Sequence, residues 1–221
     1  MTEGTRVALT FDAEHPDRPH HGDHTAWVLD ELRRLDVRAT VFLQGRWVEA
    51  FPDLARRVAA EGHLVGNHSF YHARMPLLSH GGFEEDIREA ERSIIEATAV
   101  DPRPWLRFPF GAGADSASLV DRLPALGYRH VGWDVEVFEW EPGRSSHEVV
   151  AAAVDGVTAH GDGAIVLLHT WPDPVAPALS DVVERLRDTG CQFVRVDELG
   201  LDQDLSSIGT PRPAVPAAPT G

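Results

Sequence analysis

Residues 63–72 read His-Leu-Val-Gly-Asn-His-Ser-Phe-Tyr-His, an apolar run followed at once by two histidines, His68 and His72, four positions apart. The apolar run predicts a short strand over residues 63–66. Side chains four residues apart can face the same way in a helical turn or in a tight loop. Because neutral imidazole is a common ligand of zinc and similar ions, the stretch predicts a strand whose carboxyl end carries part of a metal site. A chain with 12 histidines also forms such pairs by chance, so the pair alone leaves a structural role open.

Strands of this kind recur along the whole chain. Short apolar, β-branched runs alternate with longer amphipathic stretches, and such alternation favours a parallel sheet or barrel over an antiparallel sandwich. The apolar runs predict strands over residues 6–11, 38–43, 63–66, 105–108, 129–135, 164–169 and 192–196. The amphipathic stretches predict helices over residues 24–36, 51–61, 83–99, 116–126, 147–159 and 179–188. We therefore expect an α/β fold with about seven strands.

The length of the chain fits a single domain. Its 221 residues suffice for one α/β domain with an ample core, which we place at residues 1–205. Residues 206–221 are rich in proline and alanine, and we expect them to form a disordered tail.

The composition limits the partners and the chemistry. The formal net charge of −15 makes nucleic acids and anionic membrane surfaces unsuitable partners. All 20 cationic residues are arginine, which excludes a lysine Schiff base. We find neither an apolar window long enough to span a bilayer nor a secretory signal pattern, and the single Cys191 cannot form an internal disulfide. We therefore expect a cytoplasmic protein.

Charged and imidazole side chains gather at the carboxyl ends of the predicted strands. They are Asp12 and Glu14, His68 and His72, Arg107, Glu136 and Glu139, and His169. In a parallel barrel these ends open on one face, where active sites are built. We therefore expect the side chains to converge on one site.

Two of these segments carry complementary charges. The first predicted strand stops on Asp12-Ala13-Glu14, so that one carboxylate could bind a metal while the other takes a proton from water. A simple turn is the alternative, because aspartate and the nearby Pro16 both favour turns. Arg107 places a fixed cation at a strand end, where it could hold and orient a carboxylate or form an ordinary surface ion pair.

Two later segments suggest an acid and a wall for the substrate. His169 ends a strongly apolar strand and is well placed as a general acid, although a lone strand-end histidine is more often structural. The acidic stretch 133–140 lies between Trp133 and Trp140. It could supply an acidic partner for a histidine and an aromatic wall for a sugar ring, or it could be an ordinary loop.

Taken together and in this order, the segments resemble the polysaccharide deacetylase family, carbohydrate esterase family 4, over residues 6–199. Residues 38–45, Arg-Ala-Thr-Val-Phe-Leu-Gln-Gly, look like the second-strand signature of that family, and residues 62–72 look like its metal motif. The resemblance implies a distorted (β/α) barrel of seven or eight strands that binds one divalent ion, typically zinc. It also implies an enzyme that hydrolyses an acetamide and releases acetate from an amino sugar or a related N-acyl compound.

The resemblance also implies roles for single residues. His68 and His72 would be metal ligands, Asp12 the general base and His169 the general acid. Arg107 would orient Asp12, and Glu139 would tune His169. We expect four residues to contact a small-molecule or oligosaccharide substrate, with Leu167 walling the acetyl methyl group: Phe110, Trp140, Leu167 and Trp171.

The chain departs from the family pattern after Asp12. Most members have a second, metal-binding aspartate directly after the first, where this chain has Ala13. A minority pattern separates the two carboxylates by one residue, so we expect Glu14 to be the third ligand. His15 and Asp12 are the alternative ligands.

Three other functions remain open from the sequence. The lost aspartate is compatible with a metal-free hydrolase of a cyclic amide or ureide on the same fold. Two histidines and one carboxylate also describe the facial triad of non-haem iron oxygenases, although such a site would leave the roles of Asp12, Arg107 and His169 unexplained. A non-catalytic carbohydrate-binding domain is the third.

Overall fold

The computed structural model describes residues 4–18 and 21–200. The predicted tail, residues 206–221, lies outside the described residues, and so does the proposed domain boundary at residue 205.

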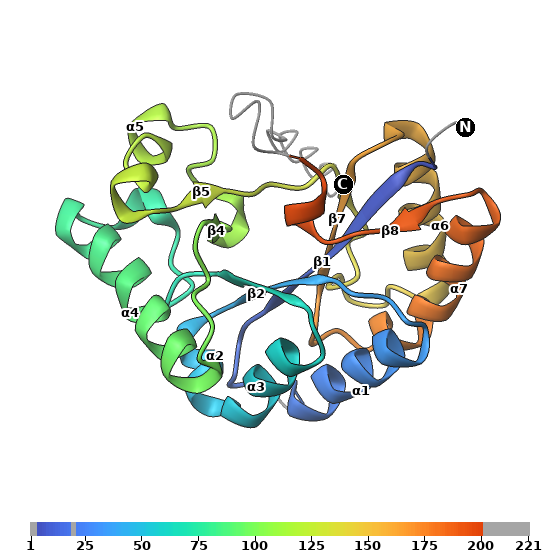
Figure 1. The fold of residues 1–221 in the computed structure, drawn as a ribbon, viewed down its shortest axis with the longest axis horizontal. Helices are drawn as coiled ribbons and strands as arrows, with labels where there is room; N and C mark the ends of the chain where they lie inside the picture. Colours follow the sequence, from blue (N-terminus) through green and yellow to red (C-terminus); the bar gives the residue numbers. More distant parts are fainter. Residues whose placement is uncertain (1–3, 19–20, 201–221) are drawn as a thin grey trace, which may run out of the picture.

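One parallel sheet forms the centre of the molecule (Figure 1). Its strands follow the order β5-β4-β3-β2-β1-β7-β6, with β8 paired to β1 outside this path. Their bounds are β1 Arg6–Ala13, β2 Thr40–Leu43, β3 Leu64–Asn67, β4 Trp105–Leu106, β5 Arg129–His130, β6 Val135–Glu136, β7 Ala164–His169 and β8 Gln192–Phe193. Every pairing in the described residues is parallel.

The sheet curls into an open half-barrel. Its two edge strands, β5 and β6, follow one another in the chain and are separated only by residues 131–134. Strand β8 pairs with the start of β1 at Arg6 and Val7, whereas β2 pairs with the end of β1 from Thr10 onward. The expected distorted barrel of seven or eight strands is thus confirmed, with its closure left incomplete between the edge strands.

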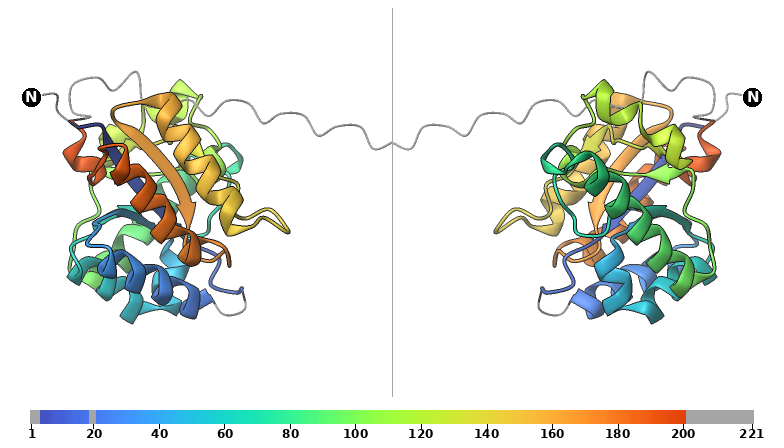
Figure 2. Two further views of the ribbon diagram at one scale, coloured as in Figure 1. Left: turned by 90° about the vertical axis from the view of Figure 1, so that its right-hand side faces the viewer. Right: turned by 90° about the vertical axis from the view of Figure 1, so that its left-hand side faces the viewer.

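Helices surround the strands in an arc (Figure 1). Figure 2 shows α6 and α7 side by side along one flank. The helices are α1 His21–Arg34, α2 Gly45–Ala50, α3 Pro52–Ala60, α4 His80–Thr98, α5 Ala117–Val120, α6 Ser146–His160 and α7 Val175–Asp188. Short 3₁₀ turns occupy η1 Met75–Leu77, η2 Pro109–Gly111, η3 Leu123–Leu126 and η4 Val196–Glu198. Within the described residues, no helix has both the length and the apolar character needed to cross a membrane.

The alternation of side chains along β1 divides the core into two layers. Val7, Leu9, Phe11 and Ala13 belong to the apolar cluster that packs the sheet against the helices. The residues between them face the interior of the half-barrel. There an apolar plug, which includes Ala8 of β1 and Ile165 of β7, fills the space near the amino ends of the strands. The polar side chains are left at the carboxyl ends.

The predicted strand over residues 129–135 is wrong as a single element. The structure has two strands there, and they lie on opposite edges of the sheet: β5 pairs with β4, and β6 pairs with β7. The carbonyl oxygens of Val131 and Gly132 accept hydrogen bonds from the Arg107 guanidinium, at 3.2 and 3.0 Å, instead of continuing a strand ladder. A buried side chain therefore interrupts the strand.

The helix predictions also need correction. The expected helix over residues 116–126 is split into α5 and η3, and Pro124, which has no backbone N–H to donate, lies in the second piece. Helix α2 was not expected, and α7 begins four residues before the expected start at Leu179.

Candidate metal centre and active site

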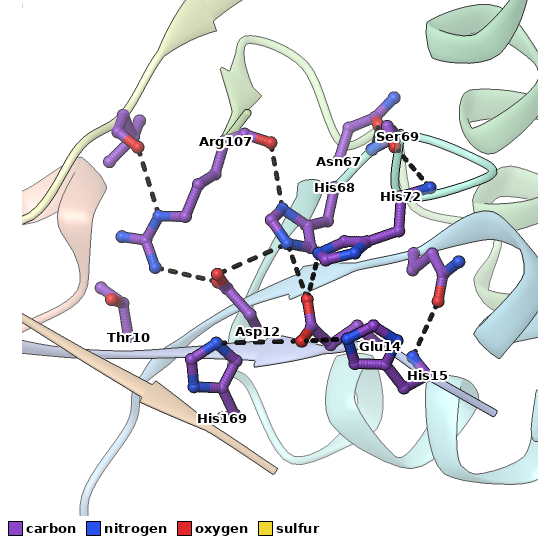
Figure 3. A network of polar contacts seen from close by, with 12 residues as sticks. Thr10, Asp12, Glu14, His15, Asn67, His68, Ser69, His72, Arg107 and His169 are labelled. Carbon is purple, nitrogen blue, oxygen red and sulfur yellow. Dashed lines mark hydrogen bonds and ion pairs between the residues drawn. The ribbon is translucent and has the colours of Figure 1, made fainter. Parts of the chain in front are cut away.

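Side chains at the carboxyl ends of β1, β3, β4 and β7 come together as Figure 3 shows: Asp12, Glu14, His68, His72, Arg107 and His169. Asp12 of β1 is the register partner of His169 in β7 on one side and of Phe42 in β2 on the other. The loop after β3 carries His68 and His72, and Arg107 directly follows β4. All of these polar side chains except that of His169 are buried.

Glu14, His68 and His72 form the group of potential metal ligands. One ligand atom from each lies within 4.8 Å of the other two, and in the described part of the chain this is the only such group of histidine, cysteine and carboxylate side chains. Glu14 Oε2 lies 3.2 Å from His68 Nε2 and contacts His72 Nε2. The three donors thus converge on one point from two loops, those that follow β1 and β3.

The protonation pattern of His68 suits a metal ligand. Its Nδ1 lies 3.0 Å from the carbonyl oxygen of Arg107, which can only accept a hydrogen bond, so Nδ1 carries the proton. The lone pair of a neutral ring is then on Nε2, which faces Glu14. Metal-ligating histidines are oriented in this way by a second hydrogen bond.

Alternation along β1 explains the pattern Asp12-Ala13-Glu14. Residues two apart in an extended chain share a face, so Asp12 and Glu14 both point to the interior. Ala13 points the other way and is fully buried in the cluster between the sheet and the helices. Ala13 therefore takes no part in the site, whereas Glu14 reaches the histidines.

The loop that carries the histidines is a tight turn and not a helical one. Ser69 and His72 have φ values of 65° and 58°. The Asn67 side chain accepts the Ser69 backbone N–H at 2.8 Å, and Ser69 Oγ accepts the His72 backbone N–H at 3.0 Å. These bonds fix the turn that brings both imidazoles to the same side.

Burial and hydrogen bonding compete at Glu14. Burial raises the pKa of this carboxyl group, but its close contacts with His15, His68 and His72 outweigh burial and hold the pKa well below its usual range. His15 Nε2 and Trp171 Nε1 lie 3.0 and 3.3 Å from Glu14 Oε1, on the oxygen that His72 does not contact. The carboxylate thus offers Oε2 to the histidine pair while Oε1 is held from the other side.

Asp12 is paired with the fully buried Arg107. Arg107 Nη1 donates to Asp12 Oδ1 at 2.9 Å, and the remaining donors of the guanidinium bind backbone carbonyl groups. Asp12 Oδ2 lies 3.5 Å from His68 Nε2, beside the ligand group but outside it. One oxygen of the carboxylate is therefore oriented by the cation, and the other faces the candidate metal centre.

His169 forms a second pair, with Glu139 from the loop after β6. Its Nδ1 donates to Glu139 Oε1 at 2.7 Å, and its Nε2 lies 3.8 Å from Glu14 Oε1. Burial lowers the pKa of His169, but the negative charge of Glu139 prevails and raises it to about 9. The ring therefore presents Nε2 to the site while Glu139 holds its other nitrogen.

The residues expected to contact substrate lie at different depths. Phe110 and Trp140 are 52% and 42% exposed, and the ring of Phe110 contacts that of His72 with centroids 4.4 Å apart and the ring planes tilted by 59°. Leu167 is buried in β7, two residues before His169. An open hollow of about 450 Å³ lies beside the centre, lined by residues that include Arg18, His24, Glu139, Trp140, Arg144 and Trp171. Trp171 borders this hollow and also binds Glu14.

Sequence reasoning missed two buried polar residues behind the site. Asp86 of α4 accepts the backbone N–H groups of Phe70 and Tyr71 at 3.1 and 3.0 Å. Gln44, directly after β2, bonds to both ligand-bearing loops. Asp86 had a readable signal, because it stands next to Ile87 on the apolar face of a regular amphipathic helix, where a lone carboxylate needs a partner.

Comparisons with known proteins identify the family of this chain. Residues 1–131 match the polysaccharide deacetylase family. The peptidoglycan-N-acetylmuramic acid deacetylase PdaA of Bacillus subtilis (strain 168) is 29% identical over 204 residues, which cover 92% of this chain and 74% of that protein. A chitooligosaccharide deacetylase of Rhizobium leguminosarum bv. trifolii is 36% identical over 174 residues, which cover 78% of this chain and 75% of that protein. The solved structure of a T48 deacetylase with substrate has a TM-score of 0.79 and 32% identity, covering 91% of this chain and 93% of that one.

The family match spans residues 1–131 of 221, and the similarity to the solved deacetylase spans almost the whole chain. The similarity to the solved structure agrees with the parallel half-barrel fold. This chain therefore belongs to the polysaccharide deacetylase family and is a hydrolase that acts on carbon–nitrogen bonds.

Proposed function

We propose that the chain is a metal-dependent N-deacetylase that releases acetate from an N-acetylated amino sugar. The observation that carries the proposal is the convergence of three parts: the ligand group Glu14, His68 and His72, the pair of Asp12 and Arg107, and His169 with Glu139. A hydrolase that uses an activated water needs a base on one side and an acid on the other, and these two pairs supply both.

The ligand group fits a divalent ion. Its donors are two imidazole nitrogens and one carboxylate oxygen, the set found in catalytic zinc sites that keep a fourth position open, and we propose zinc as the ion. When bound there, such an ion would polarise the amide carbonyl of the substrate and lower the pKa of water. The pairing of His68 Nδ1 with a carbonyl oxygen supports this assignment, because it leaves Nε2 free to ligate.

The protein's own side chains perform the proton transfers in this mechanism. Asp12, oriented by Arg107, accepts the proton of the attacking water. His169, held at Nδ1 by Glu139, donates from Nε2 to the departing amine, which is a poor leaving group unless it is protonated. Water attack and amine release thus use groups on adjacent strands, β1 and β7.

Exposed aromatic rings at the rim suit a carbohydrate. Phe110 and Trp140 each expose a large part of the ring, and we propose that they contact the sugar while the buried Leu167 lies against the acetyl group. The substrate class is an N-acetylated oligosaccharide or a small amino sugar. A cytoplasmic location is part of the proposal, and fractionation of the source cells would test it.

The first test measures metal content and acetate release together. We expect the purified chain to bind about one zinc ion and to release acetate from chitooligosaccharides or peptidoglycan fragments. Exhaustive chelation should abolish the release, and added zinc should restore it. A His68→Ala/His72→Ala variant should lose both metal and activity, whereas the exposed His80→Ala variant should keep both.

The other readings predict different results. Acetate release that persists after complete chelation would support a metal-free hydrolase. Saturable binding of an oligosaccharide without turnover by the zinc-loaded chain would support a carbohydrate-binding domain.

A further inference from the structure

Gln44 lies between the two loops that carry the candidate metal ligands. It follows β2 directly and is only 2% exposed. Its side-chain Oε1 accepts the backbone N–H of His15, the residue after Glu14, at 3.0 Å. Its Nε2 donates to the backbone carbonyl of Phe70, between His68 and His72, at 3.1 Å. One amide group therefore binds the backbone of both ligand loops.

The orientation of this amide is fixed by its partners. The N–H of His15 requires an acceptor and the carbonyl of Phe70 requires a donor, so the oxygen and nitrogen of Gln44 cannot exchange places. Although Gln44 precedes helix α2, its side chain does not cap that helix. The buried amide of Gln44 therefore connects the two ligand loops through hydrogen bonds at its oxygen and its nitrogen.

The backbone around Gln44 reinforces the link. Its own N–H donates to the carbonyl of Ala13 at 3.0 Å, next to Glu14. The N–H groups of Gly45 and Arg46 donate to the carbonyls of Ser69 and Phe70 at 2.9 and 3.3 Å. The chain at the start of α2 thus contacts the end of β1 on one side and the histidine loop on the other.

Glu14 has a particular need for such a support. It lies one residue beyond the last residue of β1, Ala13, so the strand ladder does not hold it in place. The following residue, His15, has a φ of 56°, a backbone conformation that non-glycine residues rarely adopt. The bond from His15 N–H to Gln44 fixes the backbone at this point, where the chain turns away from the sheet.

We propose that Gln44 is a positioning residue that sets the separation of Glu14 from His68 and His72 and thereby the metal affinity of the site. The proposal rests on the proposed function, because it takes these three side chains as metal ligands. Residues that orient ligands without touching the metal typically contribute about 10–100-fold to metal affinity.

The test compares the zinc affinities of three variants with that of the unchanged full-length chain. Gln44→Met keeps the length of the side chain and removes both hydrogen bonds. Gln44→Asn keeps the amide but is one methylene shorter, so it cannot reach both loops. Gln192→Met is the matched control, because Gln192 is exposed on β8, at the opposite end of β1 from Glu14. Zinc dissociation constants come from competition with a chromogenic chelator, and visible spectra of the cobalt-loaded proteins report coordination geometry.

We expect both Gln44 variants to bind zinc about 10–100-fold more weakly, with altered cobalt spectra, while Gln192→Met stays unchanged. The melting temperatures of the metal-free proteins separate positioning from stability. Dissociation constants within about threefold of the unchanged chain would overturn the proposal, since an orienting partner has a larger effect than that. A lowered melting temperature with normal zinc binding would also overturn the proposal, and so would failure of both Gln44 variants to fold. In either case Gln44 would serve the fold alone. Absence of zinc binding by the unchanged chain would instead overturn the proposed function, a result seen before any variant is made.

Discussion

His169 is the side chain whose proposed role depends most on one neighbour. Its Nδ1 is held by Glu139, so its Nε2 points toward the site and is available to protonate a leaving group. We expect His169→Ala to lower kcat by about 10²–10⁴-fold, the usual contribution of general acid catalysis. The measurement is acetate release from the substrate at saturating concentration. His147→Ala, on an exposed position of α6, is the control and should keep full activity. Retention of more than about a tenth of kcat by His169→Ala would remove the acid role.

Single residues also show how far the sequence could predict the site. Glu14 was predictable as a partner of the histidines because strand alternation alone places Asp12 and Glu14 on one face and Ala13 on the other. Gln44 was not predictable in the same way. Its partners, His15 and Phe70, lie 29 and 26 residues away in sequence, and nothing local indicates that their loops meet at one amide. Residues that act through tertiary contacts of the backbone leave no periodic signal.

At the scale of elements, helix α4 anchors the histidine loop through Asp86. This buried carboxylate accepts hydrogen bonds from the backbone N–H groups of Phe70 and Tyr71. Removal of the carboxylate would leave both N–H groups without this acceptor. We expect Asp86→Ala to lower the free energy of unfolding by about 1.5–3 kcal/mol, the range for hydrogen bonds to a charged group. Urea denaturation of the metal-free protein measures this. Glu85→Ala, the exposed neighbour on the same helix, should change little, and an equal loss in both variants would contradict the anchoring role.

Elements were predicted well where one local pattern decides them and poorly where a distant side chain does. Strands β1 and β7 appear as apolar runs and were expected near their true bounds. The break between β5 and β6 depends on Arg107, which comes more than twenty residues earlier. Its guanidinium donates hydrogen bonds to the carbonyl oxygens of Val131 and Gly132. In contrast, the break in the expected helix over residues 116–126 was readable, because Pro124 weakens a helix at that point.

For the molecule as a whole, the order of charged strand ends was enough to predict one site on a parallel barrel. Parallel strands must all present their carboxyl ends on the same side, so the fold class alone brings residues 12, 68, 107 and 169 together. The incomplete closure could not be predicted in this way, since it depends on which strands pair at the two edges. The fold also buries titratable groups that take no part in this site, and these make the stability of the domain depend on pH.

His63 is such a group, and it should make the domain sensitive to mild acid. Its Nδ1 accepts the backbone N–H of Ala39 at 3.1 Å, and its Nε2 is buried without a hydrogen-bond partner in the described residues. Burial lowers its pKa from 6.5 in spite of the nearby Glu61. As the pH falls below about 6.5, the unfolded state therefore binds more protons than the folded state. The free energy of unfolding then decreases as the pH drops toward the pKa of His63 in the folded state, by at most about 1.4 kcal/mol per pH unit.

We expect the free energy of unfolding of the metal-free protein to fall between pH 6.5 and 5. The His63→Asn variant keeps a hydrogen-bond acceptor but does not titrate, so it should lose less stability over this range. The exposed His80→Asn should behave as the unchanged chain does, and an undiminished loss in His63→Asn would assign the acid sensitivity to other groups.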